Sequence, residues 1–337
     1  MTLTNLNEIA EYIVSNGKGI LAADESTGTI KKRFDSINTE STEQSRKTYR
    51  EMLFQADGMK GNIGGVILFE ETLKQISEDG TSLVKVISNQ GALPGIKVDK
   101  GLSPINDNSE ETVTNGLDDL DQRCKEYFEL GAKFTKWRAV INIGNDVPTD
   151  NCINENMHRL ANYAKIVQTN KMVPIVEPEV IMDGSHSIDE CYEVTSRVLK
   201  SLFKHLKDKN VDITGTILKP NMVISGNSCP IQAGVKEVAE KTVKCLLENV
   251  PEELPGIAFL SGGQSDIDAT AHLDAMNKIG GFSWKLSFSY GRALQQAALK
   301  AWMGKEENMT NAKSAFSHRA LMNKKAALGN WNKDLEN

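Results

Sequence analysis

The segments FTKWRAVI (residues 134–141) and VPIVEPE (residues 173–179) decide the fold that we predict for this chain. Each is a short run, rich in Ile, Val, Leu or Phe, of the kind that forms a strand buried on both faces. Six further runs share this pattern: GILAADE (19–25), GGVILFE (64–70), GIKVDK (95–100), TGTILK (214–219), GIAFLSG (256–262) and FSWKLSFS (282–289). The sequence therefore predicts eight buried strands.

Helix-like segments separate most of these runs. They cover residues 43–59, 117–130, 154–169, 188–207, 233–248 and 266–278. Buried strands that alternate with helices over this length predict the α/β class and a (β/α)8 TIM barrel, with additional N- and C-terminal helices. No Ser/Gly linker or low-complexity tract divides the chain. We therefore expect one domain, 1–337, with the barrel at about 19–300 and a helical, flexible C-terminal tail at about 321–337.

A doubly wound open sheet is the structural alternative. Residues 17–22 (GKGILA) match the letters of a dinucleotide-binding GxGxxA motif. In that motif, however, the glycines follow a strand and open a helix, whereas here they end a helix and open a strand. The barrel is therefore the preferred prediction.

Composition excludes several classes of protein. The 337 residues carry 39 Lys plus Arg and 45 Asp plus Glu, so a formal net charge of −6 gives no basis for nucleic-acid binding. No apolar stretch approaches the length of a transmembrane helix, and the N-terminus lacks the pattern of a signal peptide, so we expect a cytoplasmic protein without membrane contact. The five cysteines are scattered, without a CxxC pair, which predicts reduced, packed thiols.

Ionisable residues gather at the carboxyl ends of the predicted strands, where a barrel of this kind builds its active site. Residues at positions i and i+2 of a strand share a face, so several of these groups should point together into the barrel mouth. Taken singly, each would be a solvated strand end or a structural ion pair. As a set they predict a site for a charged ligand, and they are Asp24, Lys97, Asp99, Lys136, Arg138, Glu177, Glu179 and Lys219.

Two glycine-containing turns follow the last two predicted strands. They are LSGGQS, with Ser261, Gly262 and Gly263, and SFSYGR, with Ser289, Gly291 and Arg292. A helix-like segment follows each turn, so backbone N–H groups at the helix starts are placed to hold an anion. Phosphate binding after strands seven and eight is common in this fold. Either turn alone would be an ordinary connection, but together they predict a phosphate site.

A lysine is the expected electrophile-forming group, because the five histidines form no HxH or HxxxH pair that would favour a metal site. Asp99 should keep Lys97 charged, whereas Arg138 beside Lys136 and the apolar neighbours of Lys219 should favour neutral amines. This reasoning leaves Lys136 and Lys219 as alternatives. Apolar sequence neighbours also make Glu177 the carboxylate whose pKa we expect to be raised towards neutrality.

The sequence resembles class I fructose-bisphosphate aldolases. The motifs that carry the resemblance occur in family order over about 270 residues: GKGILAADESTG, GGVILFEETL, GIKVDKG, KWR, VPIVEPE, LKPNMV, FLSGGQS and FSYGRALQ. The resemblance implies a metal-independent enzyme without a cofactor that cleaves the phosphosugar fructose 1,6-bisphosphate reversibly, in glycolysis and gluconeogenesis. It further implies a homo-oligomer, a tetramer in this family.

Residue roles also follow from the resemblance. Lys219 takes the position of the Schiff-base lysine and Glu177 that of the main proton-transfer carboxylate, with Glu179 beside it. Asp24, Lys136 and Arg138 match other catalytic or substrate-orienting positions. One substrate phosphate is expected at Ser261, Gly262, Gly263, Ser289, Gly291 and Arg292, and the region of the other end is expected to include Ser26, Arg33, Lys97 and Arg46.

One feature departs from the family pattern. Animal members end in a flexible tail with a terminal tyrosine that assists a later proton transfer, whereas no tyrosine follows Tyr290 in this sequence. We therefore expect that step to differ or to be slower here. Two alternatives to the aldolase hypothesis are a Schiff-base transaldolase or other phosphosugar lyase on the same barrel, and a barrel that serves only to bind cytoskeletal or adhesion partners.

Overall fold

The computed structural model describes residues 3, 5–107 and 109–336. Within these residues eight parallel strands close into a barrel in the order β1-β10-β9-β8-β7-β6-β3-β2. The strands are β1 (Gly19–Ala23), β2 (Ile63–Leu68), β3 (Leu93–Lys97), β6 (Phe134–Ile141), β7 (Val173–Val180), β8 (Ile217–Leu218), β9 (Gly256–Phe259) and β10 (Lys285–Tyr290). The predicted TIM barrel is confirmed, and each strand corresponds to one predicted run.

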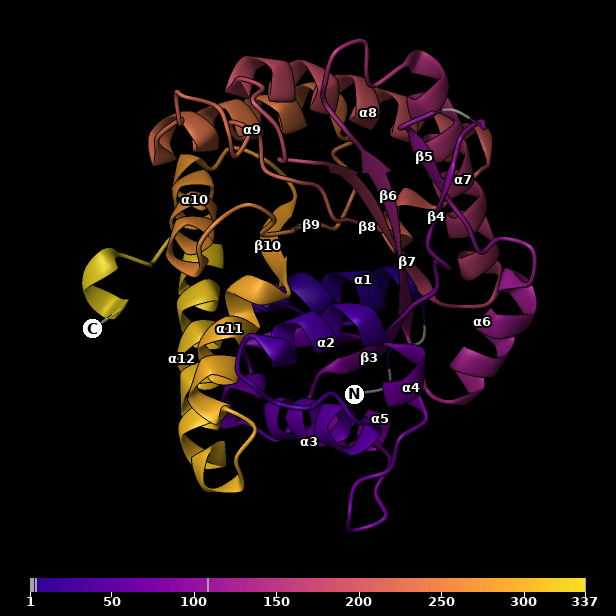
Figure 1. The fold of residues 1–337 in the computed structure, drawn as a ribbon. Helices are drawn as coiled ribbons and strands as arrows, with labels where there is room; N and C mark the ends of the chain where they lie inside the picture. Colours follow the sequence, from indigo (N-terminus) through magenta and orange to yellow (C-terminus); the bar gives the residue numbers. More distant parts are fainter. Residues whose placement is uncertain (1–2, 4, 108, 337) are drawn as a thin grey trace.

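Helices surround the barrel (Figure 1). They are α1 (Leu6–Val14), α2 (Thr27–Asp35), α3 (Glu43–Phe54), α4 (Glu70–Leu73), α5 (Leu83–Asn89), α6 (Leu120–Glu129), α7 (Asp150–Thr169), α8 (Ile188–Asp208), α9 (Val235–Asn249), α10 (Asp266–Ile279), α11 (Arg292–Trp302) and α12 (Met309–Ala327). An antiparallel hairpin of β4 (Leu102–Pro104) and β5 (Thr112–Thr114), which the sequence did not predict, follows β3.

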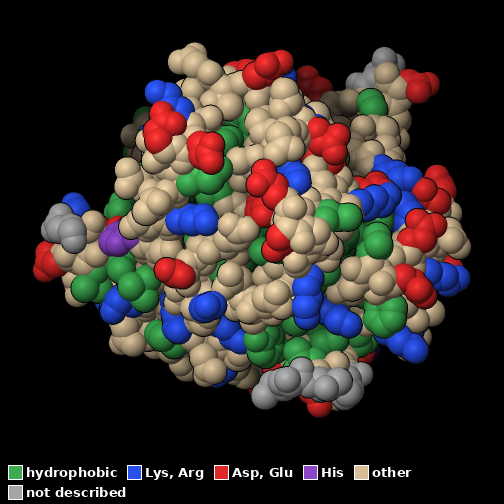
Figure 2. Space-filling view, turned by 90° about the horizontal axis from the view of Figure 1, so that it is seen from below, with side chains coloured by type: hydrophobic (Ala, Val, Ile, Leu, Met, Phe, Trp, Pro, Cys, Tyr) green, Lys and Arg blue, Asp and Glu red, His purple; other side chains and the backbone are tan. Residues whose placement is uncertain are grey.

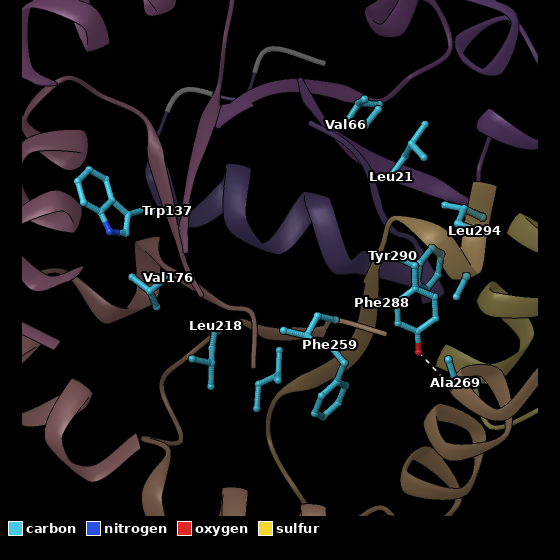
Figure 3. Packing of buried hydrophobic residues seen from close by; sticks show 14 of the residues in the cluster. Leu21, Val66, Trp137, Val176, Leu218, Phe259, Ala269, Phe288, Tyr290 and Leu294 are labelled. Atoms are coloured by element: carbon cyan, nitrogen blue, oxygen red, sulfur yellow. Dashed lines mark hydrogen bonds between the residues drawn. The ribbon is translucent and has the colours of Figure 1, made fainter. Parts of the chain in front are cut away.

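Strand β6 shows how the barrel separates its two faces. Phe134 belongs to a cluster inside the barrel, whereas Trp137 packs outward against Tyr163 of α7 with 5.4 Å between ring centroids. Figure 3 shows Trp137 with Val176 and Leu218 of the next two strands in the layer between strands and helices. Even-numbered side chains of β6, such as Phe134, therefore point into the barrel, and odd-numbered ones, such as Trp137, point towards the helices.

Helix α1 closes the amino-terminal end of the barrel. Its Ile13 and Val14 join the inner cluster with Phe134. The approach is close: a Cβ atom on Gly64 of β2 would lie 2.0 Å from the Ile13 carbonyl oxygen, and one on Gly256 of β9 would lie 2.6 Å from Val14. Glycine is thus required where the helix meets the strands, and this apolar floor leaves the opposite end of the barrel for polar chemistry.

The predicted C-terminal tail at about 321–337 comprises the end of α12 and a 3-10 turn (Lys333–Glu336). Trp331 is buried, and its backbone N–H donates to Asp274 of α10 at 2.9 Å. Glu336 accepts hydrogen bonds from Arg319 and, at 2.8 Å, from the Trp331 indole. The described part of this tail is therefore tied to α10 and α12 by specific contacts.

The surface carries charges of both signs. Figure 2 shows lysine and arginine side chains interspersed with aspartate and glutamate on the face seen from below. In the described part of the chain, no helix has the length and apolar character needed to cross a membrane. All five cysteines are free, and four of them are buried, as packed thiols should be.

Candidate active site

A cavity of about 980 Å³ opens at the carboxyl ends of the barrel strands. All predicted site residues except Arg46 and Gly263 line it: Asp24, Ser26, Arg33, Lys97, Asp99, Lys136, Arg138, Glu177, Glu179, Lys219, Ser261, Gly262, Ser289, Gly291 and Arg292. The barrel thus brings together residues that lie more than 250 positions apart in the sequence. The cavity is lined both by charged side chains and by backbone turns that can bind anions.

Two lysines and two carboxylates form the centre of this cavity. Lys136 Nζ lies 2.8 Å from Asp24 Oδ2 and 3.2 Å from Glu177 Oε2. Lys219 Nζ lies 3.1 Å from Glu177 Oε1. Glu177 therefore stands between the two amines and faces each with a different oxygen. The two lysines and Glu177 are buried, so their charges interact with little screening by solvent.

The structure contradicts our expectation that the Lys136 amine would be neutral, because carboxylates surround it. Burial lowers the pKa of Lys136, but the carboxylates of Asp24, Glu177 and Asp99 outweigh burial and raise that pKa above its ordinary value. Arg138, which we expected to favour a neutral Lys136, is instead paired with Glu179. Lys136 is therefore held in its ammonium form, a poor nucleophile, and this leaves Lys219 as the better candidate for covalent chemistry.

The pKa of Glu177 is also opposite to our expectation. Burial raises it, but the cations Lys136, Lys219 and Arg138 together lower it below the ordinary value. Burial raises the pKa of the neighbouring Glu179, against the attraction of Arg138. Glu177 is thus an ionised carboxylate in the resting site, ready to accept a proton.

Asp24 is ionised for the same reason. Burial would raise its pKa, yet the nearby ammonium groups of Lys136 and Lys219 hold the pKa of this carboxyl well below its usual range. Asp24 and Glu177 are thus two carboxylates that can accept protons, and both are paired with the buried ammonium group of Lys136. Such an arrangement can take protons from substrate hydroxyls while the lysine stabilises the negative charge that develops.

The two predicted phosphate turns lie side by side, because β9 and β10 are adjacent strands. Ser261 and Gly262 precede α10, and Gly291 is the residue before the first turn of α11. Ser289 is buried, and its hydroxyl oxygen has no hydrogen-bond partner within the described residues. A buried hydroxyl that lines a cavity without a partner is available to a ligand.

Lys97 faces these turns from across the cavity. In the closed order of strands, β3 stands four places from β9 in either direction, which is diametrically opposite. Lys97 ends β3, and its ammonium group lies 2.6 Å from Asp99 Oδ1, as the shared face predicts. Strands β6, β7 and β8 lie between the two sides, with Lys136 within β6, Glu177 within β7 and Lys219 directly after β8. The cavity thus offers cations at opposite walls and reactive groups between them.

Arg33 lies at a different wall from the one the resemblance implies. Its Nη1 donates to Glu25 at 2.5 Å, and a Cβ atom on Gly291 would lie 3.5 Å from its Nη2. Arg33 is therefore beside the turn that follows β10. Ser26 caps α2, accepting from the Thr29 backbone N–H at 3.4 Å.

The structure does not bring Arg46 or Gly263 into the cavity. Arg46 is buried and makes a two-pronged ion pair with Glu71, with its Nη2 at 2.6 Å from Oε2. Gly263 has a φ of +72°, and a Cβ atom there would lie 2.3 Å from Met182. Gly263 therefore shapes the turn that presents Ser261 and Gly262 without lining the cavity itself.

The cavity also contains residues that sequence reasoning missed. Among them are Glu25, Lys100, Thr29 and Lys32 of α2, Arg123 and Tyr127 of α6, and Gln295 and Lys300 of α11. Helical periodicity could have found Thr29, four positions from Arg33, and Gln295 and Lys300, three and eight positions from Arg292, because residues at these spacings share a helix face. Within the described residues no group of three or more His, Cys, Asp or Glu is arranged to hold a metal ion.

Comparison with known proteins gives one consistent result. The family described as "Glycolytic: Fructose-bisphosphate aldolase class-I" matches residues 5–337. A "Probable fructose-bisphosphate aldolase class 1" of Xanthomonas campestris pv. campestris is 52% identical over 98% of this chain and 99% of its own. "Fructose-bisphosphate aldolase 4, cytosolic" of Arabidopsis thaliana is 52% identical over 97% of this chain and 84% of its own.

A solved structure agrees with these sequence relatives. Fructose-bisphosphate aldolase from Plasmodium falciparum, in complex with TRAP and a small molecule inhibitor, superimposes with a TM-score of 0.95. It is 48% identical in sequence, and the match covers 97% of this chain and 95% of that one. On the strength of the family match over nearly its whole length and of these relatives, the chain belongs to the class I fructose-bisphosphate aldolase family.

Proposed function

We propose that this protein cleaves fructose 1,6-bisphosphate reversibly through a Schiff base on Lys219, without a metal or other cofactor. The observation that carries this proposal is the position of Lys219 Nζ, buried and 3.1 Å from the ionised Glu177. A lysine amine attacks only when it is neutral, and an adjacent carboxylate base can remove its proton. The family to which the chain belongs supplies the substrate class.

The first half of the reaction forms the iminium. Glu177 takes one proton from the Lys219 ammonium, the neutral Nζ adds to the C2 carbonyl of the open-chain ketose, and a second proton passes from the added nitrogen to the C2 oxygen to give the carbinolamine. The same carboxyl then protonates the C2 oxygen of the carbinolamine, which leaves as water. Because Glu177 is buried between Lys136 and Lys219, it reaches these atoms without exchange with bulk solvent.

Cleavage follows from the iminium as electron sink. The C3–C4 bond breaks, its electron pair moves into the iminium to give an enamine, and the C4 hydroxyl proton passes to Asp24 or Glu177, the two ionised carboxylates on Lys136. Glyceraldehyde 3-phosphate then leaves. Protonation of the enamine at C3 and addition of water to the new iminium return dihydroxyacetone phosphate and free Lys219.

The remaining residues bind the two ends of the substrate. Ser261, Gly262, Gly291 and Arg292 would hold one phosphate through hydroxyl, backbone N–H and guanidinium groups at the starts of α10 and α11. Lys97, on the opposite wall, would hold the other. Arg138 and Glu179 would orient the chain between them.

Borohydride reduction in the presence of dihydroxyacetone phosphate, followed by peptide mapping, tests this function. We expect a stable adduct on Lys219 and cleavage activity that EDTA leaves unchanged. An adduct found only on another lysine, or activity that EDTA abolishes, would overturn the mechanism. Rates with fructose 1-phosphate, and transfer to erythrose 4-phosphate, distinguish this enzyme from other phosphosugar lyases and from a transaldolase.

We further propose a cytoplasmic homotetramer that acts in glycolysis and gluconeogenesis. A cytosolic relative from Arabidopsis thaliana supports the location, and the glycolytic family supports the pathway. The tetramer rests on the family resemblance alone. Light scattering on the purified protein tests it, with a mass four times 37.1 kDa expected.

A further inference from the structure

Gln295 is a buried polar residue of α11 that lines the active-site cavity. Its Nε2 donates two hydrogen bonds, one to the Ala22 carbonyl at 2.6 Å and one to Glu25 Oε1 at 2.8 Å. Both acceptors flank Asp24 at the end of β1. Neither the catalytic proposal nor the phosphate sites use Gln295, so these two bonds need a separate explanation.

Arg50 of α3 completes the arrangement from the other side. It is fully buried, and its Nη2 donates to the Glu25 carbonyl at 2.8 Å, while its Nη1 donates to Thr72 at 2.8 Å. The backbone on both sides of Asp24 is therefore held by a side chain from a different helix. Such bracketing fixes the direction in which the Asp24 carboxylate leaves the strand, which is towards Lys136.

The Glu25 carboxylate extends the connection to Arg33. Its Oε1 accepts from Gln295 and also from Arg33 Nη1 at 2.5 Å. Arg33 in turn lies beside Gly291, in the turn from which α11 begins. Gln295 thus touches, directly or through Glu25, both the strand end that carries Asp24 and the guanidinium beside the phosphate turn.

We propose that Gln295 is a positioning residue, which acts through Ala22 and Glu25 to orient Asp24 for proton transfer and Arg33 for phosphate binding. This inference rests on the role proposed for Asp24 and adds a phosphate-binding role for Arg33, whose guanidinium lies beside Gly291. A glutamine suits the task because its amide donates to a carbonyl and a carboxylate together without adding charge beside Glu25. Its loss should misplace two groups of different function, with separate kinetic consequences.

The substitution Gln295→Met tests the proposal, because it retains the length of the side chain and removes both donors. A hydrogen bond to a charged group is strong enough that we expect kcat/KM to fall about 10- to 100-fold. The loss should divide between a lower kcat, from Asp24, and a higher KM, from Arg33. The fraction of Lys219 trapped by borohydride with saturating dihydroxyacetone phosphate should not change.

Tyr49→Phe is the matched control. Tyr49 is buried next to Gln295, and within the described residues its hydroxyl donates only to the Gln295 main-chain carbonyl, at 3.4 Å. This variant perturbs the same region of the core without touching Glu25 or Ala22, so its kcat and KM should remain within about twofold of the parent values. An equal loss in both variants would indicate a merely structural role and overturn the proposal.

The double variant Arg33→Ala/Gln295→Met checks the route through Glu25. If Gln295 acts on KM through Arg33, its substitution should leave KM unchanged when Arg33 is already absent, while kcat still falls. Additive effects on KM would contradict this route. If Gln295→Met does not fold, Gln295→Leu, which also removes both donors without adding charge beside Glu25, gives the same comparison. Failure of the parent protein to form the Lys219 adduct would overturn the proposed function instead.

Discussion

At the residue scale, Glu177 is the group on which the two amines of the site converge. Replacement by glutamine retains the shape and removes the base, while Lys136 and Lys219 lose a shared counter-charge. We expect Glu177→Gln to lower kcat by about 10²- to 10⁴-fold, the usual value of a general acid or base, with a smaller effect on KM. Steady-state kinetics with fructose 1,6-bisphosphate measures both.

Glu193→Gln serves as the control for this substitution, because Glu193 is an exposed residue of α8 outside the cavity. Its kinetic constants should equal those of the parent. Single-turnover trapping adds a second readout, since slow formation of the Lys219 adduct in Glu177→Gln would place the defect before cleavage. Unchanged kcat in Glu177→Gln would exclude Glu177 as the proton-transfer group.

His272 of α10 gives a residue-scale prediction for stability. Burial lowers the pKa of His272 to about 4, and its Nδ1 lies 2.6 Å from Gln264 Oε1 in the turn after β9. The folded state therefore binds fewer protons than the unfolded state between that value and the ordinary pKa of about 6.5, so stability falls as the pH falls through this range. From pH 7 to pH 5 the loss due to His272 is about 2 kcal/mol.

Urea unfolding at pH 7 and pH 5 measures this effect in the parent and in His272→Gln. The variant lacks the titrating ring, so its stability should change by about 2 kcal/mol less than that of the parent over the same interval. Equal changes in the two proteins would show that His272 remains unprotonated in the unfolded state or charged in the folded one, contrary to the structure.

Residue types at the strand ends were predictable from the sequence, but their ionisation was not. Val176 and Pro178 flank Glu177 in the chain and suggested an apolar environment. In a strand they belong to the opposite face, where Val176 packs in the outer layer, while Glu177 meets Lys136 and Lys219 from other strands. Which charges meet across the barrel is set by strand order, which sequence neighbours do not show.

At the scale of elements, the contact between α1 and the barrel floor is so close that it leaves no room for a side chain on Gly64. A Cβ atom on Gly64 would lie 2.0 Å from the Ile13 carbonyl oxygen and 2.9 Å from its Cα, both backbone atoms that cannot move without displacing α1. We therefore expect Gly64→Ala to destabilise the protein by about 3 kcal/mol or more. Chemical denaturation of the purified variant measures the change in free energy of unfolding.

Gly28→Ala should change the free energy of unfolding in the opposite direction. Gly28 lies in α2, and a Cβ atom there would have no neighbour within 4 Å in the described part of the chain. Alanine is favoured over glycine in a helix, so this variant should gain about 0.4–1 kcal/mol. If both variants lost stability to a similar degree, the specific contact between Gly64 and α1 would not be the cause.

Buried strands were the elements most accessible to prediction. Residues 134–141 form β6 with the predicted bounds, because both faces of this strand are covered. Of the run predicted at 214–219, only the two residues of β8 form a strand. A 3-10 helix (Ile213–Gly215) precedes β8, and the strand ends before Lys219. The hairpin of β4 and β5 was missed because its three-residue strands are partly exposed and show no continuous apolar run.

At the scale of the whole molecule, the acidic chain presents a basic cavity. Ten lysines and arginines line it against six aspartates and glutamates: Lys32, Arg33, Lys97, Lys100, Arg123, Lys136, Arg138, Lys219, Arg292 and Lys300, against Asp24, Glu25, Glu70, Asp99, Glu177 and Glu179. The protein as a whole has a net charge of −6. The local excess of positive charge should therefore attract a substrate with two phosphates despite the negative charge of the molecule.

Salt should weaken this attraction. Because ions screen exposed charges beyond about 10 Å at 0.1 M, we expect kcat/KM for fructose 1,6-bisphosphate to fall several-fold as NaCl rises from low to moderate concentration. The change should lie in KM, since the buried pairs around Glu177 are screened much less. A neutral osmolyte is the control. An effect of the same size on kcat would instead indicate that salt disturbs the catalytic cluster.

The apolar floor made by α1, Phe134 and their neighbours has a consequence for the order of events. With the barrel sealed at that end, both products use the mouth through which the substrate entered. In the mechanism proposed above, a covalent bond to Lys219 keeps one fragment in place while the other diffuses out, so a single opening serves a reaction that yields two products. The covalent bond therefore determines which of the two products leaves first.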